Sequence, residues 1–267
     1  MKLGFIGAGN MAGAIAAGIV KNGYVKADDV FVSDVVNAQC ERLREAVGVH
    51  IADSNVDLAK KADVIFLAVK PIFLPEVLKE IKPHIAGKAI VSIVTGWSHS
   101  RIMEGLGGAG DVKLACVMPN TPALVCAGMT AIIDNHTLGE NMFAFVRGLF
   151  DSIGRTTLLP ERLMEGFIAI SGSSPAYVFM FIEAMADAGV KEGLPRALAY
   201  EAAAQAVKGA AEMVLLGNEH PAALKDAVCS PGGTTIEAVI ELEKGGMRSA
   251  VMNAVAANAN KARSLSK

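Results

Sequence analysis

The sequence predicts an α/β fold, in which a doubly wound parallel sheet is followed by an all-α domain. Up to residue 160, short runs rich in Val and Ile alternate with amphipathic runs, which is typical of strands buried on both faces and joined by helices. After Pro160 no convincing strand follows. We therefore expect a sheet domain over residues 1–160 and a helical domain over residues 161–267.

The strands expected in the first domain are short and show little polar alternation. In chain order they are Lys2–Ile6, Val30–Ser33, Val64–Val69, Lys88–Val94, Lys113–Met118, Met129–Ile133 and Arg155–Leu159. The helices expected between them are amphipathic and are Met11–Asn22, Ala38–Ala46, Leu74–Ile81, Ser100–Leu106 and Gly139–Phe150. This alternation predicts parallel strands connected by crossover helices.

The second domain is expected to be helical throughout. Its predicted helices are Glu161–Ile170, Pro175–Gly189, Pro195–Leu216, Pro221–Val228, Thr234–Lys244 and Met247–Ser264. Three of them start with proline, which favours the first helical position. Residues 196–211 include eight alanines in sixteen, and such small side chains build only a thin core. We therefore expect a second copy of the chain to complete this domain.

Composition excludes several classes of function. A net charge of −2 gives no electrostatic basis for binding nucleic acid or an anionic membrane. Neither the four cysteines nor the five histidines show metal-ligand spacing, so we expect no metal site and reduced thiols in a cytoplasmic protein. They are Cys40, Cys116, Cys126, Cys229, His50, His84, His99, His136 and His220.

Two uncharged runs are long enough to suggest membrane segments. Leu3–Val20 contains five glycines, and Leu114–Ile133 contains Pro119 and Pro122 near its centre. Both are better interpreted as a buried strand with its loop, so we expect neither a membrane span nor a targeting segment.

A glycine motif at the end of the first expected strand predicts a dinucleotide site. Gly7, Gly9 and Ala12 form the pattern G-x-G-x-x-A between a strand and a helix. The first glycine allows the tight turn, the second lets the backbone approach a diphosphate, and the alanine allows the helix to pack on the strand. The helix N-terminus then favours the negative charge. This pattern indicates a Rossmann-type domain.

The second expected strand ends in Ser33-Asp34, about 20 residues beyond the motif, where an acid that binds ribose is expected. No Lys or Arg follows directly, and a carboxylate repels a 2′-phosphate, so NADH is mildly favoured over NADPH. The alternative is a glycine-rich turn with Asp34 as a helix N-cap. Ala68-Val69-Lys70-Pro71 ends another strand and is expected to line the same crevice, although Lys70 could also be a solvated turn residue.

Two stretches of the helical domain place hydroxyls and free N–H groups at a helix start. They are Ser171–Tyr177 and Ser230–Thr235. They could be plain helix connectors, or together a cup for a carboxylate. No Ser–His–Asp set, carboxylate pair or activated Lys accompanies them. The chemistry should therefore need little acid–base help, as in hydride transfer to an electrophilic double bond.

Taken together, these motifs resemble those of pyrroline-5-carboxylate reductases over the whole chain. The resemblance lies in Gly4–Ala12, Ala68–Pro71, Val117–Ala123, Ser171–Ser173, Pro175–Tyr177 and Ser230–Thr235. It implies NADPH- or NADH-dependent reduction of the C=N bond of Δ1-pyrroline-5-carboxylate to L-proline, by direct hydride transfer to the iminium carbon. It also implies a homodimer, or a ring of dimers, formed through the helical domain.

The resemblance also implies roles for individual residues. Gly7, Gly9, Asn10, Met11 and Ala12 would hold the diphosphate, Ser33, Asp34 and Asn55 the adenosine ribose, and Ala68, Val69, Lys70 and Pro71 the nicotinamide side. The cyclic imino acid would contact Ser173, Val228, Ser230, Pro231, Gly232, Gly233, Thr234 and Thr235. Thr235, which would hydrogen-bond the ring nitrogen, and Ser230 are the candidate catalytic residues.

Four positions depart from the usual pattern of that family. Cys116 stands where Arg is common, Ser174 where Gly is common and Cys229 where Thr or Ser is common, while Trp97 lies in an unusual segment near the expected nicotinamide. These departures keep two alternatives open. One is a β-hydroxyacid dehydrogenase, although the Lys-x-x-x-Asn pattern of such enzymes is missing before the last helices. The other is a redox sensor that binds a dinucleotide without turnover.

Overall fold

The computed structural model describes residues 1–108 and 112–265. The chain forms two compact units. The first contains Met1–Gly172 and the segment from Asn258 onwards, and the second contains Ser173–Ala257. The domain boundary predicted after residue 160 stays a prediction.

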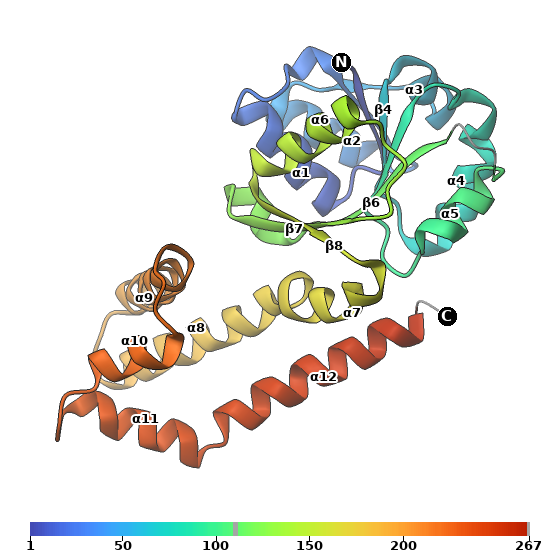
Figure 1. Ribbon diagram of the computed structural model, residues 1–267. Helices are drawn as coiled ribbons and strands as arrows, with labels where there is room; N and C mark the ends of the chain where they lie inside the picture. The colour runs from blue at the N-terminus through green and yellow to red at the C-terminus, as the bar shows by residue number, and fades with distance from the viewer. Residues whose placement is uncertain (109–111, 266–267) are drawn as a thin grey trace. The chain divides into compact units, whose positions relative to one another are not determined.

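One sheet of eight strands organises the first unit, in the order β3-β2-β1-β4-β5-β6-β7-β8. Figure 1 shows this sheet with helices packed around it. The strands are β1 (Leu3–Ile6), β2 (Val30–Ser33), β3 (His50–Ile51), β4 (Val64–Leu67), β5 (Ala89–Ser92), β6 (Lys113–Met118), β7 (Gly128–Ile133) and β8 (Gly154–Leu159). The first six run parallel. The order reverses at β1 and β4, so the doubly wound α/β fold predicted from the sequence is confirmed.

The last two strands depart from a purely parallel sheet. β7 pairs with β6 in the antiparallel sense, and β8 then pairs parallel to β7. The cause is the short connection between β6 and β7, which is too short for a helical crossover of a dozen or more residues. The chain therefore turns back after β6, and β7 and β8 run antiparallel to the first six strands.

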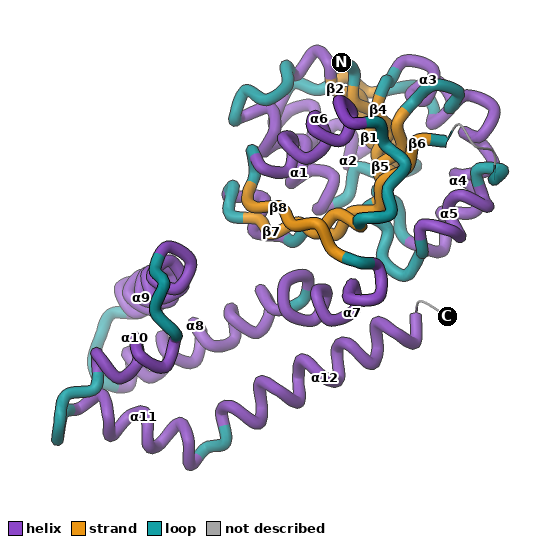
Figure 2. The backbone as a smooth tube through the Cα atoms, viewed as in Figure 1, coloured by secondary structure: helices purple, strands orange, loops and turns teal. Residues whose placement is uncertain are grey.

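Helices cover both faces of the sheet (Figure 2). Those that lie wholly in the first unit are α1 (Asn10–Lys21), α2 (Asn37–Val47), α3 (Asn55–Lys61), α4 (Leu74–Ile81), α5 (His99–Gly105), α6 (Glu140–Asp151) and α7 (Met164–Phe167). Helices α1, α2 and α6 share one apolar core with Phe5 and Phe66, whose rings stack at 4.4 Å. Helices α3, α4 and α5 share the other with Ile65 and Leu67. Adjacent residues of a strand thus pack into cores on opposite faces of the sheet. Both faces are therefore apolar, which explains why the strand sequences show no alternation of polar and apolar residues.

Sequence reasoning missed two short elements, β3 and α3. A strand of two residues carries no periodicity that could identify it. Helix α3 does carry a start signal, because Ser54 is its N-cap and accepts a hydrogen bond from the backbone N–H of Asp57. Recognising that cap would have located the helix.

The remaining helices follow the predicted pattern closely. They are α8 (Ser174–Lys191), α9 (Arg196–Leu216), α10 (Pro221–Val228), α11 (Thr234–Lys244) and α12 (Met247–Leu265). Pro221 is the first residue of its helix and Pro175 the second, whereas Pro195 is the N-cap and not the first residue. The helix predicted over Glu161–Ile170 is a 3-10 turn, the single turn of α7 and a π-turn ending at Gly172.

The helices of the second unit bury very little. Within α8 and α9 only Ala186, Ala199 and Ala203 are buried. Large apolar side chains remain exposed along both helices, including Phe179, Met180, Met213, Leu215 and Leu216. The stretch Glu161–Lys191 is even long and apolar enough to cross a membrane, by length and composition alone. The single chain therefore leaves a helical surface without an apolar partner.

A buried amide links β7 to the segment that precedes α8. Asn120 accepts a hydrogen bond from the backbone N–H of Met129 at 2.8 Å and donates to the carbonyl of Ser171 at 3.1 Å and to its hydroxyl at 3.2 Å. Both Asn120 and Ser171 are buried. The Met-Pro-Asn motif at the end of β6 thus has a structural role in this fold.

Replacing Asn120 with Ala removes three hydrogen bonds at a buried position, one from the N–H of Met129 and two to the carbonyl and hydroxyl of Ser171. We expect the free energy of unfolding to fall by roughly 2–4 kcal/mol, measured by urea titration. The matched control is Thr121→Ala at the neighbouring exposed position, which should change stability by less than about 0.5 kcal/mol. Equal effects of the two variants would contradict the structural role of Asn120.

Candidate cofactor crevice and substrate loop

The turn from β1 into α1 can be made only by glycine at its first position. Gly7 has φ +104°, and a Cβ there would lie 2.5 Å from the carbonyl oxygen of Ala68. Its N–H donates to the carbonyl of Ser33 at 2.7 Å. The ends of β1, β2 and β4 therefore meet at this residue.

The start of α1 has the properties of an anion site. Gly9 is its N-cap, no side chain caps the helix, and its first turn carries no acidic residue. A Cβ added to Gly9 would meet only the Gln39 side chain, at 3.9 Å, so the space above the turn is open. Asn10 is exposed, Met11 is half-buried and Ala12 packs into the core. A diphosphate fits this arrangement, because free N–H groups and an open approach coincide.

Asp34 fixes this turn through both of its carboxylate oxygens. One of its carboxylate oxygens accepts from the N–H of Ala8 at 2.7 Å, and the other accepts from the N–H of Val36 at 2.9 Å. The alternative of Asp34 as the N-cap of α2 is wrong, because that cap is Val36. A carboxylate has further lone pairs, so both bonds leave room for a ribose hydroxyl.

The side chains of Ser33, the last residue of β2, and Asn55 lie together. The Ser33 hydroxyl donates to the amide oxygen of Asn55 at 3.0 Å. Ser33 is only 7% exposed, whereas Asn55, the first residue of α3, is half-buried. The structure therefore brings Ser33 and Asn55, two of the three predicted ribose contacts, to one place.

The segment after β4 lies on the other side of the glycine turn. Ala68 donates its N–H to the carbonyl of Ile6 at 2.8 Å, which continues the pairing of β4 with β1. Val69 is half-buried, Lys70 is exposed, and Pro71 begins a 3-10 turn. The reversal of strand order between β1 and β4 is where such sheets bind ligands.

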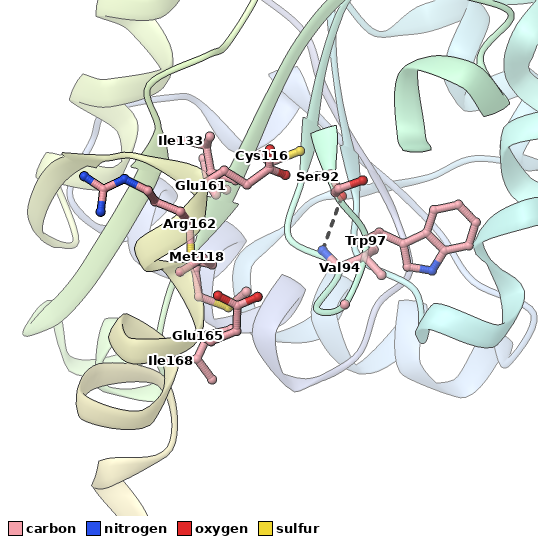
Figure 3. A pocket seen from close by; sticks show the side chains of 14 residues that line it. Ser92, Val94, Trp97, Cys116, Met118, Ile133, Glu161, Arg162, Glu165 and Ile168 are labelled. Carbon is pink, nitrogen blue, oxygen red and sulfur yellow. Dashed lines mark hydrogen bonds between the residues drawn. The ribbon is translucent and has the colours of Figure 1, made fainter. Parts of the chain in front are cut away.

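A cavity of about 340 Å³ lies further along the same edge, beside β5 and β6 (Figure 3). Its lining includes Val94 and Trp97 after β5, Cys116 and Met118 of β6, and Glu165 of α7. Two of the unusual positions, Trp97 and Cys116, therefore line one cavity. Burial raises the pKa of the Cys116 thiol to about 12, with a further contribution from the nearby Glu161, so this cysteine is a neutral thiol.

Glu161 and His99 form a polar cluster next to this cavity. One carboxylate oxygen of Glu161 accepts from the backbone N–H of His99 at 2.9 Å, and the other accepts from Asn135 at 3.3 Å. The Nε2 atom of His99 is buried and has no hydrogen-bond partner among the described residues. Burial lowers the pKa of His99, because the charged imidazolium would lose its hydration there.

The predicted substrate loop belongs to the second unit and joins α10 to α11. Gly232 has φ +67°, and the N–H of Gly233 donates to the carbonyl of Ser230 at 3.0 Å. A Cβ on Gly233 would meet the Ser230 hydroxyl at 2.3 Å. Helix α11 then starts at Thr234 without a side-chain cap. Two glycines are thus needed to form a tight turn at a free helix N-terminus.

The other predicted substrate contacts have varied environments. Thr235 is half-buried in the first turn of α11, while Pro231 and Thr234 are exposed. Val228 ends α10 and is 64% exposed, and Ser173 is the N-cap of α8. Among the described residues, no group of His, Cys, Asp or Glu side chains could hold a metal ion.

The fold and its glycine turn define a dinucleotide-dependent oxidoreductase. Residues 2–96 match the sequence model of the family described as "NADP oxidoreductase coenzyme F420-dependent". Residues 161–265 match the model described as "Pyrroline-5-carboxylate reductase dimerisation". The exposed apolar helices are therefore in a domain that associates with a second copy in its family.

Full-length relatives specify the family further. The chain is 46% identical to the pyrroline-5-carboxylate reductase of Escherichia coli, covering 100% of this chain and 98% of that protein. A solved pyrroline carboxylate reductase from Plasmodium falciparum, with NADP bound, has a TM-score of 0.91 at 36% identity and covers 100% of this chain and 98% of its own. The corresponding Coxiella burnetii structure has a TM-score of 0.88 at 33% identity, with the same coverage. The chain belongs to the pyrroline-5-carboxylate reductase family.

The two glycines of the turn should respond differently to alanine. Gly9→Ala adds a methyl group to open space, so the free energy of unfolding should change by less than about 0.5 kcal/mol. The affinity for the dinucleotide should nevertheless fall about tenfold or more. Gly7→Ala should instead cost about 2 kcal/mol of stability or more, because of its backbone conformation and the contact with Ala68. Thermal denaturation and fluorescence titration measure the two effects. Unchanged dinucleotide binding in Gly9→Ala would contradict a diphosphate at this turn.

The lowered pKa of His99 predicts a pH dependence of stability. Below the unfolded value of about 6.5, the unfolded chain takes up a proton that the folded protein resists, so stability falls as the pH falls. We expect the melting temperature to drop between pH 7.5 and 5.5, and to drop less in His99→Gln. His84→Gln, at a partly exposed position, is the control and should keep the wild-type slope. The same slope in all three proteins would exclude His99 as the cause.

Proposed function

We propose that this protein reduces the C=N bond of Δ1-pyrroline-5-carboxylate and so forms L-proline, the last step of proline biosynthesis. The observation that carries this proposal is the match to the Escherichia coli pyrroline-5-carboxylate reductase at 46% identity over the whole chain. This relationship also favours an imine reductase over the β-hydroxyacid dehydrogenase considered from the sequence.

The dinucleotide occupies the edge of the sheet formed by the ends of β1, β2 and β4. The start of α1 receives the diphosphate, the Ser33–Asn55 pair and Asp34 face the adenosine ribose, and the segment after β4 lies beside the nicotinamide. Gly7, Gly9, Asn10, Met11, Ala12, Ser33, Asp34, Asn55, Ala68, Val69, Lys70 and Pro71 make up this site. The open space above Gly9 and the uncapped start of α1 support it.

The substrate carboxylate binds at the start of α11. The turn of Ser230, Gly232 and Gly233 leaves backbone N–H groups free there, and these orient the carboxylate. The hydroxyl of Thr235 forms a hydrogen bond with the ring nitrogen of the imine. The remaining contacts come from Ser173, Val228, Pro231 and Thr234.

The reaction needs positioning more than acid–base catalysis. Protonation of the ring nitrogen makes the adjacent carbon strongly electrophilic, and the bound reduced nicotinamide supplies the hydride. The protein holds the ring through its carboxylate and its nitrogen, and excludes water from the reacting faces. Because the residues of the Ser230–Thr235 loop only position the substrate, hydroxyls and N–H groups are sufficient there and charged side chains are not required.

NADH is the preferred cofactor in this proposal, and NADPH the alternative. The Asp34 carboxylate lies at the ribose end, and no Lys or Arg occurs between Asp34 and Glu41 to neutralise a 2′-phosphate. The Plasmodium falciparum relative is described with NADP bound, so the two cofactors have to be compared directly.

The working form is a homodimer, or a ring of dimers, in the cytoplasm. The match of residues 161–265 to a dimerisation domain and the exposed apolar side chains of α8 and α9 support association through the helices. The apolar stretch Glu161–Lys191 packs against a second copy and not against lipid. The net charge of −2 supports a protein without nucleic-acid partners.

Thr235→Ala tests the reaction and the loop together. We expect kcat/KM for Δ1-pyrroline-5-carboxylate to fall about 10- to 100-fold, because a hydrogen bond to a charged group is worth roughly 1.5–3 kcal/mol. Oxidation of NADH and, separately, NADPH measures this. Thr235→Ser keeps the hydroxyl and should retain most of the activity.

The outcomes separate the proposed enzyme from the sensor. Dinucleotide binding without turnover of the imine by the wild type would contradict the reductase and favour a protein that only senses the dinucleotide. Turnover that is unaffected in Thr235→Ala would retain the reaction but remove Thr235 from the site.

A further inference from the structure

A chain of two hydrogen bonds extends from the ribose end of the crevice to a neighbouring helix. The Ser33 hydroxyl donates to the Asn55 amide oxygen at 3.0 Å, and the Asn55 amide nitrogen donates to a carboxylate oxygen of Glu80 at 2.8 Å. Ser33 ends β2, Asn55 begins α3, and Glu80 lies near the end of α4. Glu80 belongs neither to the proposed dinucleotide contacts nor to the substrate loop.

Glu80 determines the direction of both hydrogen bonds. A carboxylate only accepts hydrogen bonds, so the amide nitrogen of Asn55 must face Glu80 and the amide oxygen must face Ser33. That oxygen then takes the single hydroxyl proton of Ser33. Because Ser33 is only 7% exposed, water competes little for this proton. Ser33 therefore presents lone pairs, and no donor, to a ligand.

Like Ser33, Asp34 offers hydrogen-bond acceptors and no donor. Both of its oxygens already accept backbone N–H groups, and its carboxylate has no proton to donate. The side chains of Ser33 and Asp34 at the end of β2 therefore offer only hydrogen-bond acceptors to a ligand. The two carboxylates of this region are those of Asp34 and Glu80. Ribose hydroxyls can donate to such a surface, whereas a 2′-phosphate brings only acceptors and more negative charge.

We propose that Glu80 is a positioning residue that, through Asn55 and Ser33, makes the adenosine-ribose subsite select a free 2′-hydroxyl over a 2′-phosphate. The inference rests on the proposed function only to the extent that the crevice binds a nicotinamide dinucleotide. Glu80 does not touch the ribose itself, and it acts by fixing which way the Asn55 amide faces.

The hydrogen-bonded chain of Glu80, Asn55 and Ser33 forms a relay. Reversing the direction of its hydrogen bonds tests this proposal. Glu80→Lys places a donor where the acceptor stood, so the Asn55 amide turns over and the Ser33 proton becomes free to bind a phosphate. Dissociation constants for NADH and NADPH, measured by nicotinamide fluorescence without substrate, give the selectivity ratio. We expect the ratio to shift toward NADPH by about three- to tenfold, the range of one ordinary hydrogen bond.

Three further variants separate the relay from simple charge. Glu76→Lys makes the same charge change one turn earlier on α4, where the described contacts include no hydrogen bond to Asn55, and should shift the ratio much less. Glu80→Gln keeps an acceptor oxygen but can also donate, so its ratio should lie between those of the wild type and Glu80→Lys. In a Ser33→Ala background, Glu80→Lys should have little further effect on the ratio, as expected for residues that act through one another.

The opposite results would overturn the proposal. Equal shifts in Glu80→Lys and Glu76→Lys would show that charge alone is responsible, and additive effects of Ser33→Ala and Glu80→Lys would show that the relay does not exist. Because the readout is binding, these results are independent of whether the protein reduces Δ1-pyrroline-5-carboxylate. A wild type that binds neither dinucleotide would overturn this inference and the proposed function together.

Discussion

The close approach of three strand ends around Gly7 is the constraint on which the cofactor crevice depends. The N–H of Gly7 is bound to the end of β2, its α-carbon lies against the carbonyl of Ala68 after β4, and Asp34 holds the next N–H along the chain. This fixes the direction in which α1 leaves the sheet. The anion site then consists of backbone N–H groups at a helix start, so it requires no cationic side chain and suits a chain with net charge −2.

The parts of this architecture that repeat a strong pattern were predictable from the sequence, and the parts set by short or long-range features were not. Buried strands such as β4 and amphipathic helices such as α4 have clear periodicity, and the glycine motif locates the turn. The direction of β7 depends on the length of one connection, and β3 has two residues. The predicted roles of the crevice and loop residues stay predictions, and the structural role of Asn120 could not be seen because its partner, Ser171, is distant in the sequence.

The helical unit illustrates how composition limits what a single chain can bury. Helix α9 buries only two alanines, and its large apolar residues, Met213 to Leu216, are exposed. Alanine allows helices to pack closely but contributes little apolar area. The stabilising burial must therefore come from another surface, and the match to a dimerisation domain identifies that surface as a second copy of the chain. For this unit, folding and association are expected to be coupled.

Two of the four unusual positions, Cys116 and Trp97, lie at one end of the sheet, where one polar environment explains both. Cys116 and Trp97 line the same cavity, and Glu161 lies near Cys116. A carboxylate beside a neutral, buried thiol needs other partners, and the His99 backbone and the Asn135 amide provide them. Burial disfavours charge on both Cys116 and His99, and the hydrogen bonds that Glu161 accepts from His99 and Asn135 come from uncharged donors. A change at Cys116 that introduced a cation would therefore compete directly with His99 and Asn135 for Glu161, and these positions are expected to vary as a group.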